Sequence, residues 1–383
     1  MTVTAPQGFR AAGVAAGLKS SGDPDVALVV NDGPDDAAAA VFTTNRFPAA
    51  PVLWSRQVLS NSRVRAVVLN SGGANACTGP EGFADTHATA EHVADTLGLG
   101  AIDVAVASTG LIGVRLPMDR LTAGISDAAT QLSGDGGAAA ARAIMTTDSV
   151  PKTTVQTGAG WTVGGMAKGA GMLAPSLATM LVVLTTDAVV PAELLAPALA
   201  HATAHSFERV DSDGCLSTND TVLVLANGAS GVTPSAAEFE AALDAACLDL
   251  AMQLLADAEG STKDIAITVS NAASVADALT AGRACARNNL LKTALFGNDP
   301  NWGRVLAAIG TTDAAFEADQ VDVTINGVTV CRAGAIGDDR DGVDLTGRAI
   351  TIDVDLRAGT ESATIWTNDL SIAYVHENSA YST

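Results

Sequence analysis

The stretch KGAGMLAPSLATMLVV, at residues 168–183, is the most informative part of the chain. A glycine-rich segment with one lysine leads into Pro175, and Thr179 then follows a small residue at the start of an apolar run. Continuous apolar runs are typical of strands that are covered on both faces. The stretch therefore predicts a loop that ends at a buried strand near residue 180.

Thr179 is also placed where a chain could cut itself. Its hydroxyl could attack the carbonyl carbon of Ala178 and shift the acyl group from nitrogen to oxygen, and hydrolysis would then leave Thr179 as a new N-terminus. The α-amino group of an N-terminal threonine, with a pKa of about 7.7–8.0, can activate the neighbouring hydroxyl. Because β-branched residues favour strands, a purely structural interpretation of this threonine stays open.

Apolar runs and helical patterns alternate along the rest of the chain. The expected strands include residues 26–30, 64–69, 104–108, 161–167, 180–185, 221–226, 265–270 and 350–356. The expected helices include residues 82–97, 138–145, 191–205, 236–258 and 274–288. This alternation predicts an α/β fold. No linker-like composition marks a domain boundary, so the division that we expect is the one between Ala178 and Thr179.

Composition and charge limit the kinds of partner and the cellular compartment that we expect. The net charge of −21 argues against nucleic acid or an anionic membrane surface as a partner. Five scattered cysteines without a C-x-x-C pair fit a reducing compartment. We find no signal-peptide pattern and no apolar run approaching ~18 residues. A soluble, cytoplasmic protein is expected.

Familiar cofactor motifs are missing from the sequence. The segment at residues 164–171 lacks the G-K-[ST] of a nucleotide P-loop, and Ala174 replaces the third glycine of a dinucleotide fingerprint. His201 and His205 stand four residues apart on an expected helix and could share a metal, but the sequence shows neither an obvious third ligand nor a C-x-x-C pair. We therefore expect neither a metal nor an organic cofactor.

Two polar, glycine-containing loops follow expected strands, where α/β proteins commonly bind ligands. They are SGGANACTG at residues 71–79 and ASTGLIG at residues 107–113. A threonine hydroxyl and a glycine N–H that converge, as Thr109 and Gly110 could, would form an oxyanion hole. Taken alone, each loop is better explained as a tight strand-to-helix turn. Glu259, expected at a helix C-terminus, opposes the helix dipole there and needs a cationic partner or a function.

Together these segments resemble the glutamate N-acetyltransferase (ornithine acetyltransferase) family of arginine biosynthesis. The matching segments run in order along nearly the whole chain: SGGANACTG (71–79), ASTGLIG (107–113), IMTTD (144–148), GGMAKGAGMLAPSLATML (164–181), DGCLSTND (213–220), AEGSTK (258–263), LLKTALFGNDPNWGR (290–304) and HENSAYST (376–383). The resemblance implies a layered α/β sandwich of the ornithine acetyltransferase type. It also implies self-cleavage between Ala178 and Thr179 into an α chain, residues 1–178, and a β chain, residues 179–383, assembled as a heterotetramer of two α and two β chains.

The resemblance further implies a role for each matching residue. Thr179 would take the acetyl group from N2-acetyl-L-ornithine as an ester and pass it to L-glutamate, which is ping-pong acyl transfer. Thr109 and Gly110 would form the oxyanion hole, and Glu259 would move the proton to and from the amine. The implied substrate-binding set is Thr146, Lys168, Thr179, Glu259, Asn378 and Thr383. Thr146 is preferred to Thr147 from its spacing to Lys168.

The sequence departs from the family pattern at two positions and leaves other functions open. Gly73 stands where asparagine is common, and Thr383 stands where serine is common. An N-terminal-nucleophile aminopeptidase or amidase, in which water takes the acyl group, is the alternative enzyme. An uncleaved amino-acid-binding protein is the non-enzymatic alternative. No motif indicates whether acetyl-CoA is also used as an acetyl donor.

Overall fold

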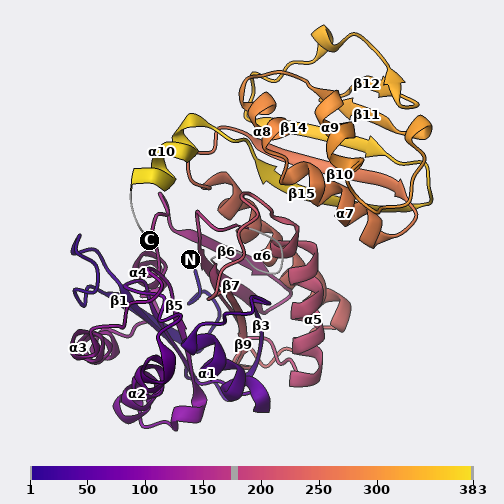
Figure 1. The fold of residues 1–383 in the computed structure, drawn as a ribbon. Helices are drawn as coiled ribbons and strands as arrows, with labels where there is room; N and C mark the ends of the chain where they lie inside the picture. Colours follow the sequence, from indigo (N-terminus) through magenta and orange to yellow (C-terminus); the bar gives the residue numbers. More distant parts are fainter. Residues whose placement is uncertain (1, 174–179, 381–383) are drawn as a thin grey trace.

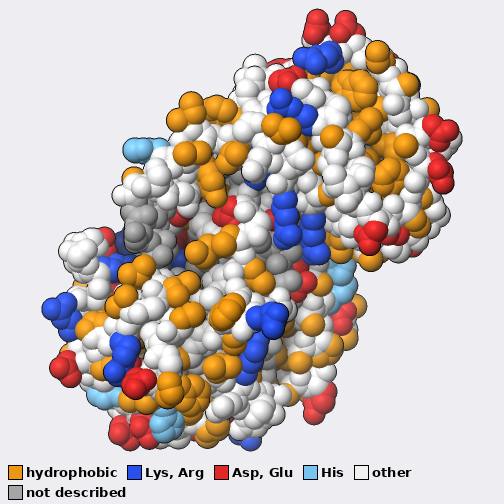
Figure 2. All heavy atoms as spheres, in the orientation of Figure 1, with side chains coloured by type: hydrophobic (Ala, Val, Ile, Leu, Met, Phe, Trp, Pro, Cys, Tyr) orange, Lys and Arg blue, Asp and Glu red, His pale blue; other side chains and the backbone are white. Residues whose placement is uncertain are grey.

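The computed structural model describes residues 2–173 and 180–380, which form a larger and a smaller lobe (Figures 1 and 2). The larger lobe holds two sheets and the smaller lobe holds one. Acidic and basic side chains are both spread over the face seen in Figure 2. No helix among the described residues is long and apolar enough to cross a membrane.

The first sheet has four strands in the order β1-β2-β4-β5. These strands are β1 (Phe9–Val14), β2 (Val26–Asn31), β4 (Ala66–Asn70) and β5 (Val104–Ser108). Two helices, α2 (Gly79–Leu97) and α3 (Met118–Thr130), pack together on this sheet. At its edges α1 (Ala50–Val58) contacts β5, and α4 (Gly137–Ala143) contacts β1. Every residue of β2, β4 and β5 is buried.

The second sheet has five strands in the order β3-β9-β8-β7-β6. They are β3 (Ala37–Phe42), β9 (Thr221–Ala226), β8 (Leu181–Thr186), β7 (Thr162–Lys168) and β6 (Lys152–Thr157). The central strand β8 pairs antiparallel with β7 and parallel with β9. Strands from both sides of residue 178 therefore share one sheet, in which β9 and β8 lie between β3 and β7.

Both faces of β8 are covered, which explains its continuous apolar sequence. Leu181 and Val183 join the core shared with the first sheet, whereas Val182 and Leu184 face a second core. That second core is completed by α5 (Ala192–His205) and α6 (Ala236–Ala256). The resulting layers of helices, sheet, sheet and helices confirm the expected layered α/β sandwich.

The smaller lobe is a domain that the sequence analysis did not separate. Its six strands run in the order β13-β12-β11-β14-β10-β15. They are β10 (Asp264–Ala272), β11 (Asp322–Ile325), β12 (Val328–Arg332), β13 (Ala335–Ile336), β14 (Ala349–Asp355) and β15 (Glu361–Asn368). Its helices are α7 (Val275–Ala286), α8 (Asn289–Phe296) and α9 (Trp302–Ile309).

This lobe has a hydrophobic core of its own, formed by buried residues between Ile265 and Ile365. It joins the larger lobe through a few residues after α6, not through a long polar linker, so composition gives no sign of the boundary. After β15 the chain returns to the larger lobe as α10 (Ile372–Ala380).

Candidate active site

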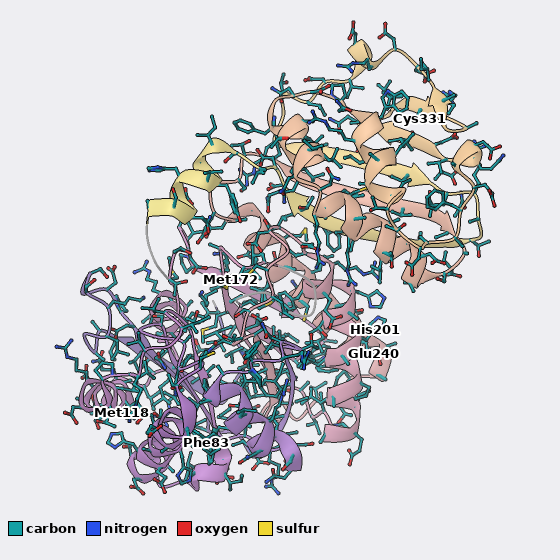
Figure 3. The ribbon with its side chains drawn as sticks, viewed as in Figure 1. Phe83, Met118, Met172, His201, Glu240 and Cys331 are labelled. Carbon is teal, nitrogen blue, oxygen red and sulfur yellow. The ribbon has the colours of Figure 1, made fainter. Side chains whose placement is uncertain are left out.

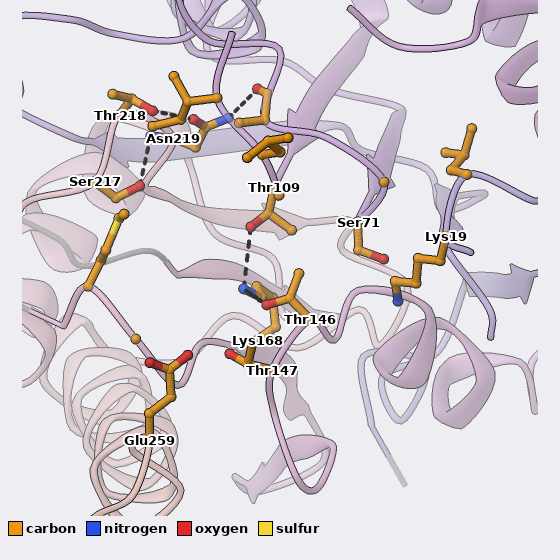
Figure 4. Close-up of a pocket in the computed structure, with 18 of the residues that line it drawn as sticks. Lys19, Ser71, Thr109, Thr146, Thr147, Lys168, Ser217, Thr218, Asn219 and Glu259 are labelled. Carbon is orange, nitrogen blue, oxygen red and sulfur yellow. Dashed lines mark hydrogen bonds between the residues drawn. The ribbon is translucent and has the colours of Figure 1, made fainter. Parts of the chain in front are cut away.

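A cavity of about 390 Å³ lies where the loops of the larger lobe meet α10 (Figure 4). Its walls come from the loops after β1, β4 and β5, from the segment after α4, from the end of β7 and from the segment before β9. Met172, at one wall, lies near the junction of the two lobes (Figure 3). The described lining residues are Leu18, Lys19, Ser20, Ser21, Ser71, Gly72, Ala74, Thr109, Gly110, Leu111, Ile112, Thr146, Thr147, Lys168, Gly171, Met172, Ser217, Thr218, Asn219, Glu259 and Asn378.

Thr109 and Gly110 lie directly after β5, at the edge of the cavity. The Thr109 N–H donates to the Asn70 carbonyl at 3.0 Å, which fixes this loop to the end of β4. Gly110 has a φ of +130°, and a Cβ there would lie 2.9 Å from Cα and N of Gly73. The turn therefore requires glycine at position 110 because of both its backbone conformation and its close approach to Gly73.

Lys168 ends β7 with its side chain almost completely buried. Its ammonium donates to Thr146 Oγ1 at 2.6 Å and to Thr109 Oγ1 at 3.3 Å, as Figure 4 shows. Burial lowers the pKa of Lys168, whereas the nearby Asp148 opposes that shift. Of the two candidate threonines, Thr146 is therefore the one that contacts the lysine, although Thr147 also lines the cavity.

Asp148 organises the buried charges beneath Lys168. Its Oδ1 accepts from Lys152 Nζ at 2.7 Å and from the Gly169 N–H at 2.6 Å, and its Oδ2 accepts from the Thr146 N–H at 2.9 Å. Lys152 also contacts Asp257 at 2.6 Å. Burial opposes ionisation of Asp148, but Lys168 and Lys152 together lower its pKa to about 2.

Glu259 lies on the wall opposite Lys19 (Figure 4). The expected helix over residues 236–258 ends at Ala256, so Glu259 lies beyond the helix and its N–H donates to the Ala170 carbonyl at 2.9 Å. This corrects the helix-terminus argument, since the position of Glu259 follows from its contact with the segment after β7. A Cβ on Gly171 would lie 2.7 Å from Glu259 Oε2, which shows how closely the carboxylate packs on that backbone.

The segment before β9 holds the cavity loops together, a function that the sequence analysis did not assign. Asn219 Nδ2 donates to the carbonyls of Ala74 at 2.6 Å and Ser108 at 2.8 Å. Asp220 follows it, fully buried, and its Oδ1 accepts from the Met180 N–H at 3.1 Å. Burial raises the pKa of Asp220 well above the ordinary value for an aspartate.

The cavity brings together six of the predicted site residues from segments far apart in sequence. These are Thr109, Gly110, Thr146, Lys168, Glu259 and Asn378. Ala178, Thr179 and Thr383 lie outside the described residues. The sequence analysis missed Lys19, which lines the cavity, and Asp148 and Lys152, which lie beneath Lys168, because no local pattern shows where they stand in the fold. Within the described part of the chain, no group of three His, Cys, Asp or Glu side chains is arranged to hold a metal ion.

Comparison with known proteins assigns the family. The sequence pattern of the ArgJ family matches residues 10–383. The chain belongs to the ArgJ family. An ArgJ relative from Streptomyces avermitilis, named arginine biosynthesis bifunctional protein ArgJ, is 66% identical over 382 residues that cover 100% of both chains. A Streptomyces coelicolor relative of the same name is 64% identical over 382 residues, again covering 100% of both chains.

A solved structure is also similar to part of the chain. It is ornithine acetyltransferase from Mycobacterium tuberculosis in complex with ornithine. The match has 63% sequence identity and a TM-score of 0.45, and it covers 47% of this chain and 96% of that one.

Proposed function

We propose that this protein transfers the acetyl group of N2-acetyl-L-ornithine to L-glutamate in arginine biosynthesis. The observation that carries the proposal is the single cavity in which Thr109, Gly110, Lys168 and Glu259 converge in a chain of the ArgJ family. The acyl-accepting residue that we propose is Thr179, freed as an N-terminus by self-cleavage after Ala178. Residues 1–178 and 179–383 would then be the α and β chains.

In the first half-reaction the Thr179 α-amino group takes the hydroxyl proton as Oγ attacks the acetyl carbonyl carbon. The Thr109 hydroxyl and the Gly110 N–H stabilise the oxyanion of the tetrahedral intermediate. The bond between the acetyl carbon and the ornithine nitrogen then breaks, and Glu259 gives the leaving amine its proton. Ornithine departs and an acetyl-Thr179 ester remains.

In the second half-reaction the glutamate amine attacks the ester carbonyl and loses its proton to Glu259. The ester bond breaks, N-acetylglutamate leaves, and Thr179 recovers its hydroxyl proton. Lys168 supports both steps because its positive charge favours the neutral form of a nearby amine. Asn378 and Thr383 complete the proposed substrate contacts together with Thr146.

We also propose a second activity, in which acetyl-CoA acetylates Thr179 and glutamate again accepts the group. The two Streptomyces relatives are named bifunctional, which supports this addition. Assembly as a heterotetramer of two α and two β chains belongs to the same proposal. All five cysteines are free thiols, which supports a cytoplasmic location.

Intact mass measurement with N-terminal sequencing tests the proposal first. We expect two fragments, one beginning Thr-Met-Leu-Val-Val, and glutamate-dependent release of ornithine from N2-acetylornithine. The matched variant Thr179→Ala should remain a single 38.3 kDa chain without transfer activity. An uncleaved, inactive wild-type protein would contradict the proposal. Ornithine release that glutamate does not accelerate would favour the amidase instead.

A further inference from the structure

The cavity has a second cation, Lys19, that the resemblance does not assign to the site. Among the described lining residues the charged side chains are Lys19, Lys168 and Glu259. Figure 4 shows Lys19 and Glu259 on opposite sides, with Lys168 and Thr109 between them. The cavity therefore offers a negative wall and a positive wall to a bound molecule.

The charge of Lys168 is already compensated within the protein. Asp148 Oδ2 lies 4.0 Å from its ammonium, and two of its protons are directed at Thr146 and Thr109. An anion bound at Lys168 would compete with that buried carboxylate. Lys19 is therefore the better partner for an anionic group of the substrate.

Lys19 is held rigidly and is half-buried. Its N–H donates to Asp25 Oδ2 at 3.0 Å, and the N–H groups of Leu18 and Ala16 donate to the same carboxylate at 2.6 Å each. Its ammonium donates to the Pro24 carbonyl at 2.9 Å and the Met145 carbonyl at 2.7 Å. An ammonium has three protons, so one remains for a ligand.

The surroundings of Lys19 suit a carboxylate. Among the described residues Lys19 forms no ion pair within 4.0 Å, and the carboxylates of Asp25, Asp23 and Asp148 act on its charge from a longer distance. The polar residues Ser20, Ser21, Ser71 and Thr147 line the cavity with it. A hydrogen bond between an ammonium and a carboxylate in such a half-buried place is stronger than one between neutral groups.

We propose that Lys19 binds the α-carboxylate that the donor and the acceptor have in common. This inference rests on the proposed function, in which one cavity serves both half-reactions. The side chain of ornithine ends in a cation and that of glutamate ends in an anion, so the side chains cannot share one charged partner. The α-carboxylate is the charged group that both molecules present at the same distance from the reacting nitrogen.

N-acetylputrescine tests this assignment, because it is N2-acetylornithine without the α-carboxylate. The variant Lys19→Met should lower kcat/KM for N2-acetylornithine by about tenfold to a hundredfold, the range expected for a lost hydrogen bond between charged groups. The same variant should leave kcat/KM for N-acetylputrescine unchanged, which also shows that it folds. Lys19→Arg should recover part of the loss.

Arg120→Met is the matched control, since Arg120 donates to the Gly17 carbonyl at 2.7 Å on the same loop but does not line the cavity. It should change neither donor's kcat/KM. Equal losses for both donors in Lys19→Met, or no loss for either, would overturn the assignment.

Calorimetric binding separates this inference from the proposed function. Lys19→Met should weaken the binding of ornithine but not that of putrescine. If wild-type protein binds ornithine with this dependence yet transfers no acetyl group, the proposed reaction fails and the carboxylate site stands. If acetyl transfer occurs and Lys19→Met binds ornithine as tightly as wild type, the reaction stands and the carboxylate site fails.

Discussion

At the scale of single residues, the site depends on a buried carboxylate between two lysines. Asp148 contacts Lys152 directly and lies 4.0 Å from Lys168, and all three side chains are almost fully excluded from water. Removing one member of such a cluster leaves the remaining charges without compensation in a poorly solvated place. Asp148 therefore supports the position of Lys168 without needing to touch a substrate.

We predict that Asp148→Asn destabilises the protein by about 3–5 kcal/mol, the cost typical of breaking a buried ion pair. Urea unfolding at pH 7 measures the change, with the exposed Asp135→Asn as the control. Since the folded pKa of Asp148 is about 2, below the unfolded value of about 3.9, its contribution is present above pH 4 and is lost as the pH falls towards 2. A variant as stable as wild type at pH 7 would contradict this account.

Gly171→Ala is predicted to impair catalysis while leaving the fold intact. The new Cβ would lie 2.7 Å from Glu259 Oε2, and the atoms it meets belong to a side chain and not to the backbone. The carboxylate would therefore have to leave its position, while the course of the backbone can stay the same. We expect a fall of at least tenfold in kcat with an unchanged melting temperature. Unchanged kcat would show that the position of this carboxylate does not limit the reaction.

Residue types in the loops identified much of the site, but not its deeper layer. Thr109, Gly110 and Lys168 stand in glycine-containing segments beside apolar runs, and such segments can be recognised locally. Lys19 and Asp148 stand in ordinary polar surroundings in the sequence. Their importance depends on contacts with Met145 and Lys168, which only the folded chain brings near.

At the scale of elements, α10 is placed by one glycine. Gly260 has a φ of +61°, and a Cβ there would lie 2.2 Å from the backbone nitrogen of Tyr374 in α10. Since Asn378 is on the same helix and lines the cavity, the contact couples the segment that holds Glu259 to the helix that holds Asn378.

We predict that Gly260→Ala displaces α10 and raises KM for N2-acetylornithine at least several-fold. The control is Gly98→Ala, at the end of α2, where φ is +71° and a Cβ would meet nothing within 4 Å. Both variants impose the same left-handed strain, of roughly 1–2 kcal/mol, but only the first adds a clash with α10. Similar KM values in the two variants would show that the clash with α10 is not what matters.

Element prediction succeeded where a strand's own sequence is sufficient. The strand expected at residues 104–108 is β5 (Val104–Ser108), and the one expected at residues 180–185 is β8 (Leu181–Thr186), one residue later. By contrast, β3 (Ala37–Phe42) was not predicted, because its four alanines carry little preference for a strand. The backbone pairing of β3 with β9 stabilises it as a strand instead.

At the scale of the whole molecule, Lys292 joins the two lobes. It belongs to α8 of the smaller lobe, and its ammonium donates to the Ser212 carbonyl of the larger lobe and to Thr367 Oγ1 at 3.1 Å. Burial lowers the pKa of Lys292 to about 8, despite the nearby carboxylates of Asp213 and Asp211. The junction of the lobes therefore contains a group that titrates just above neutral pH.

We predict that the lobe junction becomes more stable as the pH rises from 8 to about 10. The folded pKa of Lys292 lies below the unfolded value of about 10.4, so the unfolded chain binds more protons within that window and stability rises with pH. Below pH 8 the cost of the buried charge is fully present. Denaturant titrations of wild type and Lys292→Met measure the effect as a difference. A difference that does not vary between pH 8 and 10 would contradict the prediction.

The second sheet, which holds strands from both sides of residue 178, has a genetic consequence. Because β8 pairs on one side with β7, from before residue 178, and is held in the same sheet as β3 and β6, chains cut after Ala178 would stay paired with the product of their own precursor. In a cell that carries two alleles of the gene, the two chains of each sheet would then always come from the same precursor. Two alleles that each damage a different side of residue 178 could not restore an intact sheet by exchanging chains.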